Sequence, residues 1–328
     1  MFLGNPMMMR KLASGPNIAN LFAATLYTGN GASRTITTGI DADMHWFKSR
    51  GSGASSAVYD TVRGVQKDVA TNLTDAETTE TEGVTAFGAT GPTIGTLGKI
   101  NTNTVTYALW SFAEAARFFS VVQYTGTGST QTIAHTLGAS PGIIFIRRTD
   151  SPSNWFVWHR SGDQTYTHRA ILNTTAAYVS SGGGAWGSSG SADMTTAYFT
   201  VGDISNVNVS GGTYRAYVFA HDAAADGVIQ CGSYTGNGSS TGPTITLGWE
   251  PQFLIIKRAD TTGDWWIYDS ARSTSNPRTK SLLANSTGAE SEAGVNVDFN
   301  STGFQPKSSD AGINASGGTY LYKVIRKA

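Results

Sequence analysis

The chain has 328 residues, of which 39% are hydrophobic and 14% are charged, and its formal net charge is zero. Its length and apolar content suffice to bury large cores, whereas charged residues are scarcer than the ~25% of ordinary globular domains. A net charge of zero excludes a general electrostatic attraction to nucleic acid or to an anionic membrane surface. The single cysteine, Cys231, excludes an intrachain disulfide.

Glycine is unusually frequent, at 39 residues, and occurs together with 14 Phe, 13 Tyr and 8 Trp. Disordered low-complexity chains lack such aromatic residues, so we expect the glycines in turns between short strands. No apolar stretch reaches the about 18 residues of a spanning helix. Near the N-terminus the basic residues Arg10 and Lys11 follow the apolar ones, the wrong order for a signal peptide. We therefore expect no membrane span and synthesis in a cytoplasm.

The first 22 residues share no pattern with the rest of the chain. They include three consecutive methionines, Met7, Met8 and Met9. Methionine side chains are flexible and fill irregular gaps between surfaces. Residues 1–22 are therefore predicted to be an arm that anchors the protein to a neighbouring subunit or scaffold, and the alternative is a frayed terminus.

A motif of the form Tyr-Thr-Gly-(Asn/Thr)-Gly then occurs three times, at residues 27–31, 124–128 and 234–238. Glycine reaches positive φ without a steric penalty, and β-branched residues follow each copy, which is typical of a β-hairpin turn. Each copy is therefore predicted to open a β-unit.

The similarity continues far beyond this motif, because an apolar strand, an aromatic strand, an Asn-x-Thr-x-Ala turn and a closing aromatic strand follow in order. The apolar and aromatic strands match best between the last two copies, at 143–150 with 253–260 and at 155–159 with 265–269. The turns and closing strands recur in all three copies, at 72–76, 173–177 and 285–289 and at 107–112, 214–219 and 320–325. The repeat predicts three domains, at residues 23–117, 118–226 and 227–328, of which the first is the most divergent.

The strands carry the pattern of antiparallel sheets. Tyr214, Ala216 and Val218 would share one face of a closing strand. Residues 143–146 and 253–256 are continuously apolar, which is typical of strands covered on both faces. No segment longer than about ten residues has helical periodicity. The sequence predicts an all-β fold of three tandem antiparallel β-sandwich domains, jelly-roll-like, behind the N-terminal arm.

No pattern for a catalytic site, a metal site or a cofactor site is found, and the protein is predicted not to be an enzyme. Four of the five histidines lie in the second domain, without the spacing of metal ligands. His159, Ser161 and Asp163 are close in sequence, but the third domain has Asp269 in place of this histidine. That difference favours a surface cluster over a catalytic triad.

The recurring charged residues are interpreted structurally. Asp60 with Arg63, and Asp269 with Arg272, follow the aromatic strand, where a charge-assisted hydrogen bond would tie down the strand end. Three cations that end the preceding strand, and the acidic segment 75–82, are expected in solvent. These cations are Lys48, Arg147 and Lys257.

The aromatic strands of the second and third domains contain Trp155, Trp158, Trp265 and Trp266. Two interpretations stay open for them: core and interdomain contacts, or an exposed pair that stacks on sugar rings. The four tryptophans are therefore candidate contacts for a glycan or a protein partner.

Taken together, these blocks resemble a family of repeated domains encoded by tailed bacteriophages. The resemblance rests on the Tyr-Thr-Gly motif, a Leu-Gly followed by proline, an Asn-Trp or Asp-Trp strand and a Ser-Gly-Gly-Thr-Tyr hairpin. It covers residues 120–328 well and residues 24–116 loosely, since the first domain lacks the proline and that hairpin. The matching segments are residues 137–141, 154–155, 210–214, 247–251, 264–265 and 316–320.

The resemblance implies a structural protein of the virion, made in the host cytoplasm, in the tail or a tail fibre, with a role in assembly and host attachment. The implied partners are other virion proteins and host surface glycans, and the analogy with fibre proteins implies a homotrimer. Two alternatives are a capsid-decorating or cement protein and a carbohydrate-binding module. A glycan-degrading enzyme would in addition need a cleft with paired carboxylates.

Overall fold

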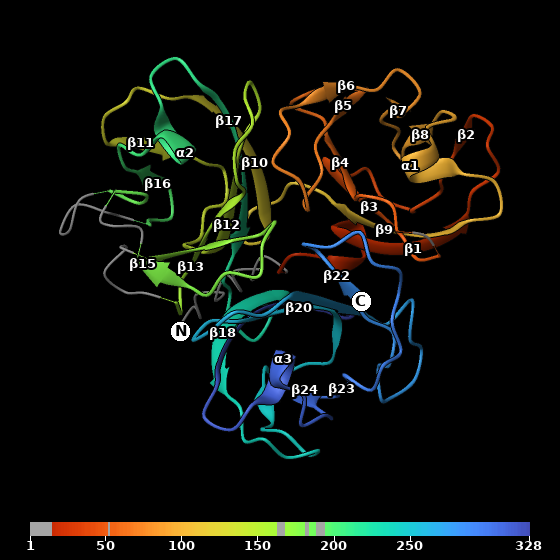
Figure 1. The fold of residues 1–328 in the computed structure, drawn as a ribbon, viewed down its shortest axis with the longest axis vertical. Helices are drawn as coiled ribbons and strands as arrows, with labels where there is room; N and C mark the ends of the chain where they lie inside the picture. The colour runs from red at the N-terminus through yellow and green to blue at the C-terminus, as the bar shows by residue number, and fades with distance from the viewer. Residues whose placement is uncertain (1–14, 52, 163–167, 181–183, 188–193) are drawn as a thin grey trace, which may run out of the picture.

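The structure, a computed structural model, describes residues 15–51, 53–162, 168–180, 184–187 and 194–328. These residues form mostly short strands, and every pair of strands among them is antiparallel (Figure 1). The predicted all-β class is therefore confirmed. Within the described ranges, no helix has the length and apolar character needed to cross a membrane.

Three large sheets repeat one strand order, in which the opening strand pairs with the closing strand, then the apolar strand, then the aromatic strand. We call the segments that contain them unit 1 (22–112), unit 2 (119–220) and unit 3 (229–326). In unit 1 the order is β1 (Phe22–Thr28), β9 (Thr106–Phe112), β3 (Met44–Ser49) and β4 (Ala57–Asp60). In unit 2 it is β10 (Phe119–Thr125), β17 (Thr213–Ala220), β12 (Pro141–Arg148), β13 (Phe156–His159), β14 (His168–Ile171) and β15 (Val179–Ser180). In unit 3 it is β18 (Ile229–Thr235), β25 (Thr319–Arg326), β20 (Pro251–Arg258), β21 (Trp265–Asp269) and β22 (Leu282–Leu283).

Each unit also contains a smaller second sheet, and in units 1 and 3 a separate apolar core lies between the two sheets. The second sheets are β2 (Arg34–Thr35), β8 (Thr93–Ile94) and β7 (Val84–Ala86); β11 (Gln131–Ala134) and β16 (Tyr198–Val201); and β19 (Ile245–Thr246), β24 (Gly303–Pro306) and β23 (Val297–Asn300). Strands β5 (Lys67–Asp68) and β6 (Thr78–Thr79) form a further pair. The helices have one turn each: η1 (Ile18–Asn20), α1 (Gly98–Asn101), α2 (Ser205–Asn208) and α3 (Ala311–Asn314).

The repeated Tyr-Thr-Gly motif opens each unit as predicted, but it is not a hairpin turn, because β18 pairs with β25 rather than with the next strand. The Tyr234 ring stacks on Tyr320 at 5.0 Å between centroids, and its hydroxyl donates to the Ile313 carbonyl at 2.6 Å. A Cβ on Gly236 would lie 2.3 Å from the Ala315 carbonyl oxygen. The motif therefore packs α3 and the residue after it against the main sheet. Glycine is required at position 236 because the backbone there approaches the Ala315 backbone so closely.

The apolar strands are buried on both faces, as their composition predicts. In β20, Leu254 and Ile256 face the core between the two sheets of unit 3. Phe253 and Ile255 point the other way, into a core cluster that includes residues of all three units. Alternation along the strand therefore supplies two different cores from one segment.

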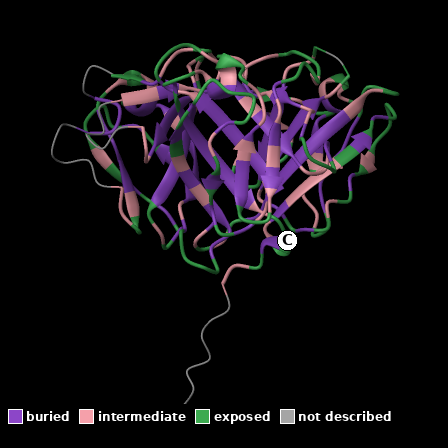
Figure 2. Cartoon of the chain, turned by 90° about the horizontal axis from the view of Figure 1, so that it is seen from below, coloured by how far each residue is buried: buried purple, intermediate pink, exposed green. Residues whose placement is uncertain are grey.

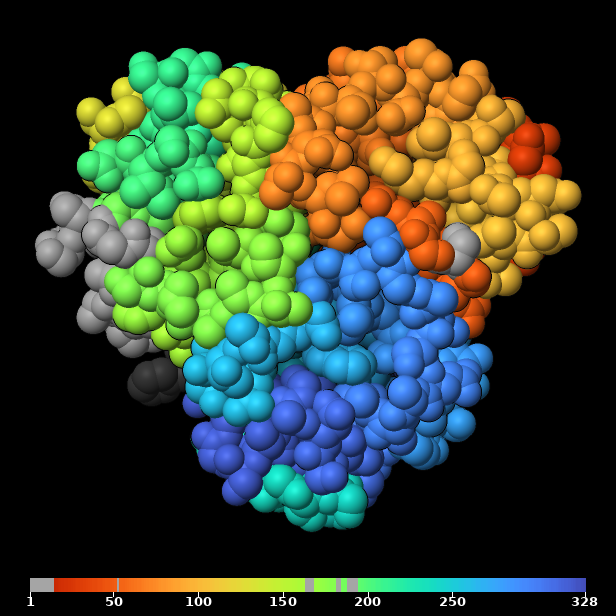
Figure 3. Space-filling model, in the orientation of Figure 1, coloured from red at the N-terminus to blue at the C-terminus, as the bar shows by residue number. Residues whose placement is uncertain are grey.

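The three units close into a ring around this shared core (Figures 1 and 3). At its centre the Phe112 ring of unit 1 lies 5.4 Å from Phe219 of unit 2 and 6.1 Å from Phe253 of unit 3. Unit 3 returns to the start of the chain, because Phe253 also packs at 5.3 Å against Phe22. The three sandwiches share their largest apolar cluster, so they pack against one another and are not independent domains joined only by linkers.

The chain segments between units gather at one end of the ring. Each opening strand is antiparallel to its closing neighbour, so the beginning of one and the end of the other lie side by side. We call this end the base; it is formed by residues 15–21, 113–118, 221–228 and 326–328. Figure 2 shows the C-terminus there, at the narrow end of the molecule.

The predicted boundary of the N-terminal arm at residue 22 is too late. Ile18 is 6% exposed, and Phe22 is 3% exposed and begins β1, so both belong to the shared core. Met7, Met8 and Met9 lie outside the described residues.

Candidate functional site

The contacts between units are the most regular polar feature of the molecule. The Glu77 amide of unit 1 donates to the Thr149 carbonyl of unit 2 at 2.9 Å. At the same position in the repeat, the Tyr178 backbone amide of unit 2 donates to the Ala259 carbonyl of unit 3 at 2.9 Å. The Glu290 backbone amide of unit 3 donates to the Arg50 carbonyl of unit 1 at 3.0 Å. The same backbone hydrogen bond therefore joins each unit to the next around the ring.

The strand-end cations reinforce these contacts. Lys48 Nζ donates to the Ser286 carbonyl at 2.5 Å, Lys257 Nζ to the Thr175 carbonyl at 3.0 Å, and Arg147 to the Asp75 carbonyl. Each acceptor belongs to a neighbouring unit. All three cations are at most 1% exposed, and burial lowers the pKa of each lysine to about 8 and the pKa of Arg147 to about 10.

The prediction that these three cations are solvated strand ends is wrong. The strand end lies at the surface of its own unit, but the neighbouring unit covers it. The acidic segment 75–82 is also only partly solvated, because the Asp75 carbonyl accepts from Arg147 and Glu77 lies 3.6 Å from Arg63. A sequence cannot reveal that a surface residue of one domain is covered by another.

The predicted pairing of aspartate with arginine after the aromatic strand is confirmed. Arg63 Nε donates to Asp60 Oδ2 at 2.5 Å, and the Tyr217 hydroxyl of unit 2 donates to the same oxygen at 2.7 Å. Burial by itself would raise the pKa of Asp60, but Arg63 and Arg215 outweigh it and hold that pKa below 3.8. The pair therefore serves the interface between units as well as the strand end.

The interface between units 3 and 1 repeats this arrangement with other residues. Arg272 Nε donates to Asp269 Oδ2 at 2.6 Å, and Trp110 Nε1 of unit 1 donates to that oxygen at 2.9 Å. Trp110 and Tyr217 occupy equivalent positions on β9 and β17. Both interfaces thus hold a buried carboxylate between an arginine of its own unit and an aromatic donor of the next.

The interface between units 2 and 3 departs from this pattern. His159 stands at the aspartate position, and its Nε2 lies 3.0 Å from the Tyr322 carbonyl. Lys323 replaces the aromatic donor, is 1% exposed, and lies 3.4 Å from the centroid of the Phe219 ring. Its Nζ has no hydrogen-bond partner among the described residues.

The candidate tryptophans are mostly interior. Trp155 is 1% exposed and donates through Nε1 to the Ala70 carbonyl of unit 1 at 2.8 Å. Trp265 is 2% exposed and donates to the Ile171 carbonyl of unit 2 at 3.0 Å. Trp158 is 4% exposed. A buried ring has no face to offer a sugar, so the glycan interpretation is wrong for these three, and the alternative of core and interunit contacts describes them.

Trp266 differs from the other three because it is half-buried on the outer side of unit 3, against its separate core. Of the four candidates, it alone keeps partial exposure.

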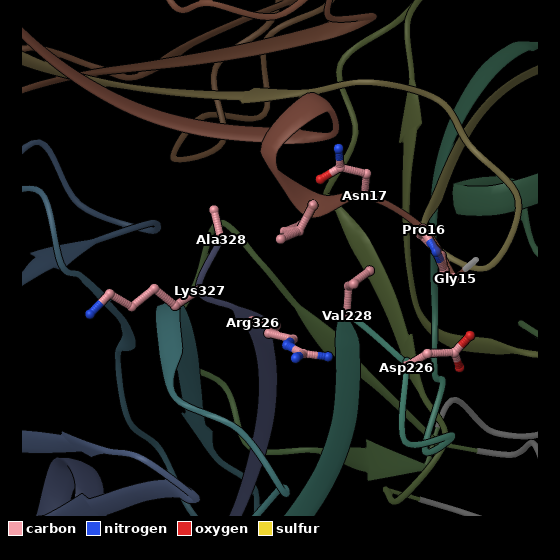
Figure 4. A pocket seen from close by; sticks show the side chains of 9 residues that line it. Gly15, Pro16, Asn17, Asp226, Val228, Arg326, Lys327 and Ala328 are labelled. Atoms are coloured by element: carbon pink, nitrogen blue, oxygen red, sulfur yellow. The ribbon is translucent and has the colours of Figure 1, made fainter.

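Shallow cavities lie at the base, among the described residues. One of about 280 Å³ lies between residues 15–18, the segment 226–228 and residues 326–328, and Figure 4 shows Val228 and Arg326 at its wall. The others, of about 430 and 420 Å³, lie beside Trp249 and beside Leu21. Arg117 ties the two linkers together, with Nε 2.8 Å from Asp222 and a terminal nitrogen 2.6 Å from Asp226.

Many titratable groups of the described chain are buried and engaged in the fold. No three of the His, Cys, Asp and Glu side chains within it are placed to hold a metal ion. His45 Nδ1 lies 2.9 Å from the Ser111 hydroxyl, an arrangement that resembles a base beside a nucleophile. Both are at most 1% exposed, and burial lowers the pKa of His45 to about 3, so the pair has neither substrate access nor a useful base.

These observations define a class of all-β protein in which three related units of one chain close into a ring through recurring contacts. The chain belongs to the family described as a domain of unknown function, DUF7483, whose model matches residues 17–327. That match takes in all three units together. No curated protein matches the chain.

Proposed function

We propose that this protein is a structural component of a tailed-bacteriophage virion, placed in the tail or a tail fibre, where it serves assembly and host attachment, and that it is not an enzyme. The proposal rests first on the resemblance of residues 120–328 to repeated domains of such particles. It extends the family membership, which by itself names no function.

The observation that carries the proposal is the way the polar side chains are used. Lys48, Arg147, Lys257, Asp60 and Asp269 would be candidates for binding or catalysis if they lined an open cleft. Instead they join the units to one another and are buried. Buried charges that hold the units of a chain together make the molecule rigid, and rigidity is what a component of a particle requires.

The expected homotrimer stays a prediction, and the ring alters what it would have to look like. A trimer of single-unit chains would need three equivalent interfaces, and here one chain supplies them all. A homotrimer of this chain would be a trimer of rings, and we propose that each ring lies with the base toward the particle.

The base is the proposed attachment face because the first described residue, Gly15, lies there beside the C-terminus. The anchoring role proposed for the preceding residues, Met7, Met8 and Met9 included, would then act from this face. Since Ile18 and Phe22 belong to the core, the proposed arm is limited to residues that precede Ile18.

The test is a phage in which residues 2–14 are deleted, with a second phage in which Met7, Met8 and Met9 are changed to serine. We expect the free variant proteins to keep the circular dichroism and melting temperature of the parent, while both are lost from purified particles. Absence of the parent protein from purified particles would refute the virion proposal. Normal incorporation of both variants would refute only the anchoring role.

Imaging of the parent particle by cryo-electron microscopy distinguishes the tail from the capsid. Density for the ring on the shell would replace the tail assignment by a decorating or cement protein. Binding to host surface glycans is left with Trp266 as its one candidate, and Trp266→Ala should lower adsorption to host cells if that contact exists.

A further inference from the structure

The interface between units 2 and 3, which we call the 2–3 interface, is chemically unlike its two counterparts. The others each centre on a buried carboxylate, Asp60 or Asp269, that pairs with an arginine of its own unit. At the 2–3 interface the equivalent residue is His159, and Gly162 stands where the arginine would be. Two titratable imidazoles, His159 and His221, and the buried Lys323 take the place of the ion pair.

The hydrogen bonds of His159 require a neutral ring. Its Nδ1 accepts from the Ser161 backbone amide at 3.1 Å, so that nitrogen carries no proton. Nε2 faces the Tyr322 carbonyl at 3.0 Å and therefore donates to it. A protonated imidazole is a donor at both nitrogens. Protonation would break the bond to Ser161 and leave a cation in a site that is 1% exposed.

His221 makes the same demand at the other end of this interface. Its Nδ1 accepts from the Cys231 backbone amide at 3.1 Å, which ties the linker after unit 2 to the opening strand of unit 3. The strands are tightly packed there, since a Cβ on Gly142 would lie 2.7 Å from the Cys231 sulfur. Loss of the hydrogen bond between His221 and Cys231 would therefore disturb the tightly packed contact between Gly142 and Cys231.

The surroundings carry more positive than negative charge. Arg160 lies close to both histidines and Lys323 lies close to Cys231. The nearby Tyr322 and Cys231 are neutral at ordinary pH, because burial raises the pKa of each to about 12. The Tyr178 hydroxyl accepts a hydrogen bond from the His159 backbone amide at 3.4 Å. Among the described residues, the carboxylate that acts on His221 is Asp222, which is already paired with Arg117 at 2.8 Å. Burial first, and Arg160 second, lower the pKa of both histidines to about 4.

The other interfaces respond to acid in a different range of pH. Asp60 is held ionised by Arg63 and Arg215, so its pKa lies below 3.8. The bond from the Tyr217 hydroxyl to Asp60 persists until this carboxylate is protonated, and at the third interface Trp110 and Arg272 both donate to Asp269. Between about pH 4 and 6.5, His159 and His221 at the 2–3 interface gain protons when it opens, whereas the position of His159 is held by Asp60 and Asp269 at the other two interfaces.

We propose that the 2–3 interface is an acid-sensitive seam, at which protonation of His159 and His221 releases unit 3 from unit 2 while unit 3 stays attached to unit 1. The device is a property of the ring and does not depend on the proposed virion role.

The experiment is hydrogen–deuterium exchange with mass spectrometry on the full chain at pH 7.5 and pH 4.8, corrected for the intrinsic exchange rates. Peptides covering 156–162, 221–231 and 320–324 report on the 2–3 interface. Peptides covering 57–63, 107–112, 214–217 and 266–272 report on the other two interfaces. A histidine with a pKa of about 4 when closed and 6.5 when open favours opening by roughly 40-fold at pH 4.8.

We expect protection in the first set of peptides to fall at least tenfold at pH 4.8 and protection in the second set to change less than twofold. His159→Gln, which cannot be protonated, should reduce the loss by up to the roughly 40-fold contribution of one histidine. The matched control is His45→Gln, a buried histidine inside unit 1, which should leave the acid response of the 2–3 interface unchanged. His159→Asp, which places a carboxylate opposite Lys323 as at the other interfaces, should also reduce the loss.

An equal loss of protection at all three interfaces of the parent protein would overturn the proposal, even if no histidine variant folds. So would an undiminished loss in folded His159→Gln.

Discussion

Lys323 should destabilise the protein in spite of its central position. Burial lowers the pKa of Lys323 from 10.5 to about 7. A difference of this size corresponds to roughly 5 kcal/mol of the free energy of unfolding. Four phenylalanine rings surround the ammonium, at 3.4 Å for Phe219 and at 5.1 to 5.5 Å for Phe112, Phe253 and Phe145. These contacts offset part of the cost, at about 0.5–2 kcal/mol each when desolvated.

The perturbation is Lys323→Met, which keeps the length of the side chain and removes the charge. We expect the free energy of unfolding at pH 7 to rise by about 1–4 kcal/mol. The sign of the pH dependence follows from the lowered pKa. Between pH 7 and 10.5 the unfolded chain binds more protons than the folded one, so the stability of the parent protein increases with pH in that window. The Met variant should lose the part of this increase that Lys323 contributes and keep the part from Lys48 and Lys257, whose pKa is about 8.

The measurement is urea unfolding followed by tryptophan fluorescence at pH 7, 8 and 9, below the titration of the tyrosines. The control is Lys327→Met, at an exposed lysine whose Nζ lies 2.9 Å from Glu250 at the base. It should change the stability by less than about 0.5 kcal/mol and keep the slope of the parent. A Met variant that is less stable than the parent at pH 7 would show that the four rings hold a full charge, and the reasoning from burial would be refuted.

Three further predictions concern the repeated contacts, each measured as a change in the free energy of unfolding. Gly236→Ala should cost several kcal/mol, since its Cβ would lie 2.3 Å from a carbonyl oxygen; Gly317→Ala, at φ 72° with open space around it, should cost only about 1 kcal/mol. Equal costs would show that the steric clash of the added Cβ at position 236 does not determine the loss of stability. Asp269→Asn leaves the buried Arg272 without its main partner and should cost about 3–5 kcal/mol; a neutral result would mean that Glu290, at 3.5 Å, suffices. Trp265→Phe removes the bond to the Ile171 carbonyl and should cost at least ~1 kcal/mol, while an unchanged midpoint would assign the indole nitrogen no role.

Much of the architecture was open to prediction because it depends on local patterns. The period of two along β20, with both sets of residues apolar, indicated a strand buried on both faces. The triple Tyr-Thr-Gly motif located the start of each unit, although its turn is not a hairpin. The spacing of Asp269 and Arg272 predicted their ion pair, because three residues after a strand end are within reach of one turn of chain.

The candidate site was not open to prediction in the same way. Lys257 looked like a solvated strand end, and Trp265 like an optional platform for sugars, because nothing in a single unit tells which of its surfaces the next unit will cover. The same holds for the ring itself: three similar sequences in tandem are equally compatible with an extended array.

The sequence by itself determined the strands, the turns and the threefold plan, since these follow from side-chain alternation and backbone preferences that act over a few residues. Only the tertiary structure decided which charges are buried, which tryptophans are hidden and where the 2–3 interface departs from its counterparts. The physical reason is that burial depends on the chain as a whole: the pKa of Lys323 and the neutral ring of His159 are set by residues more than 100 positions away, which close around them only when unit 3 returns to unit 1.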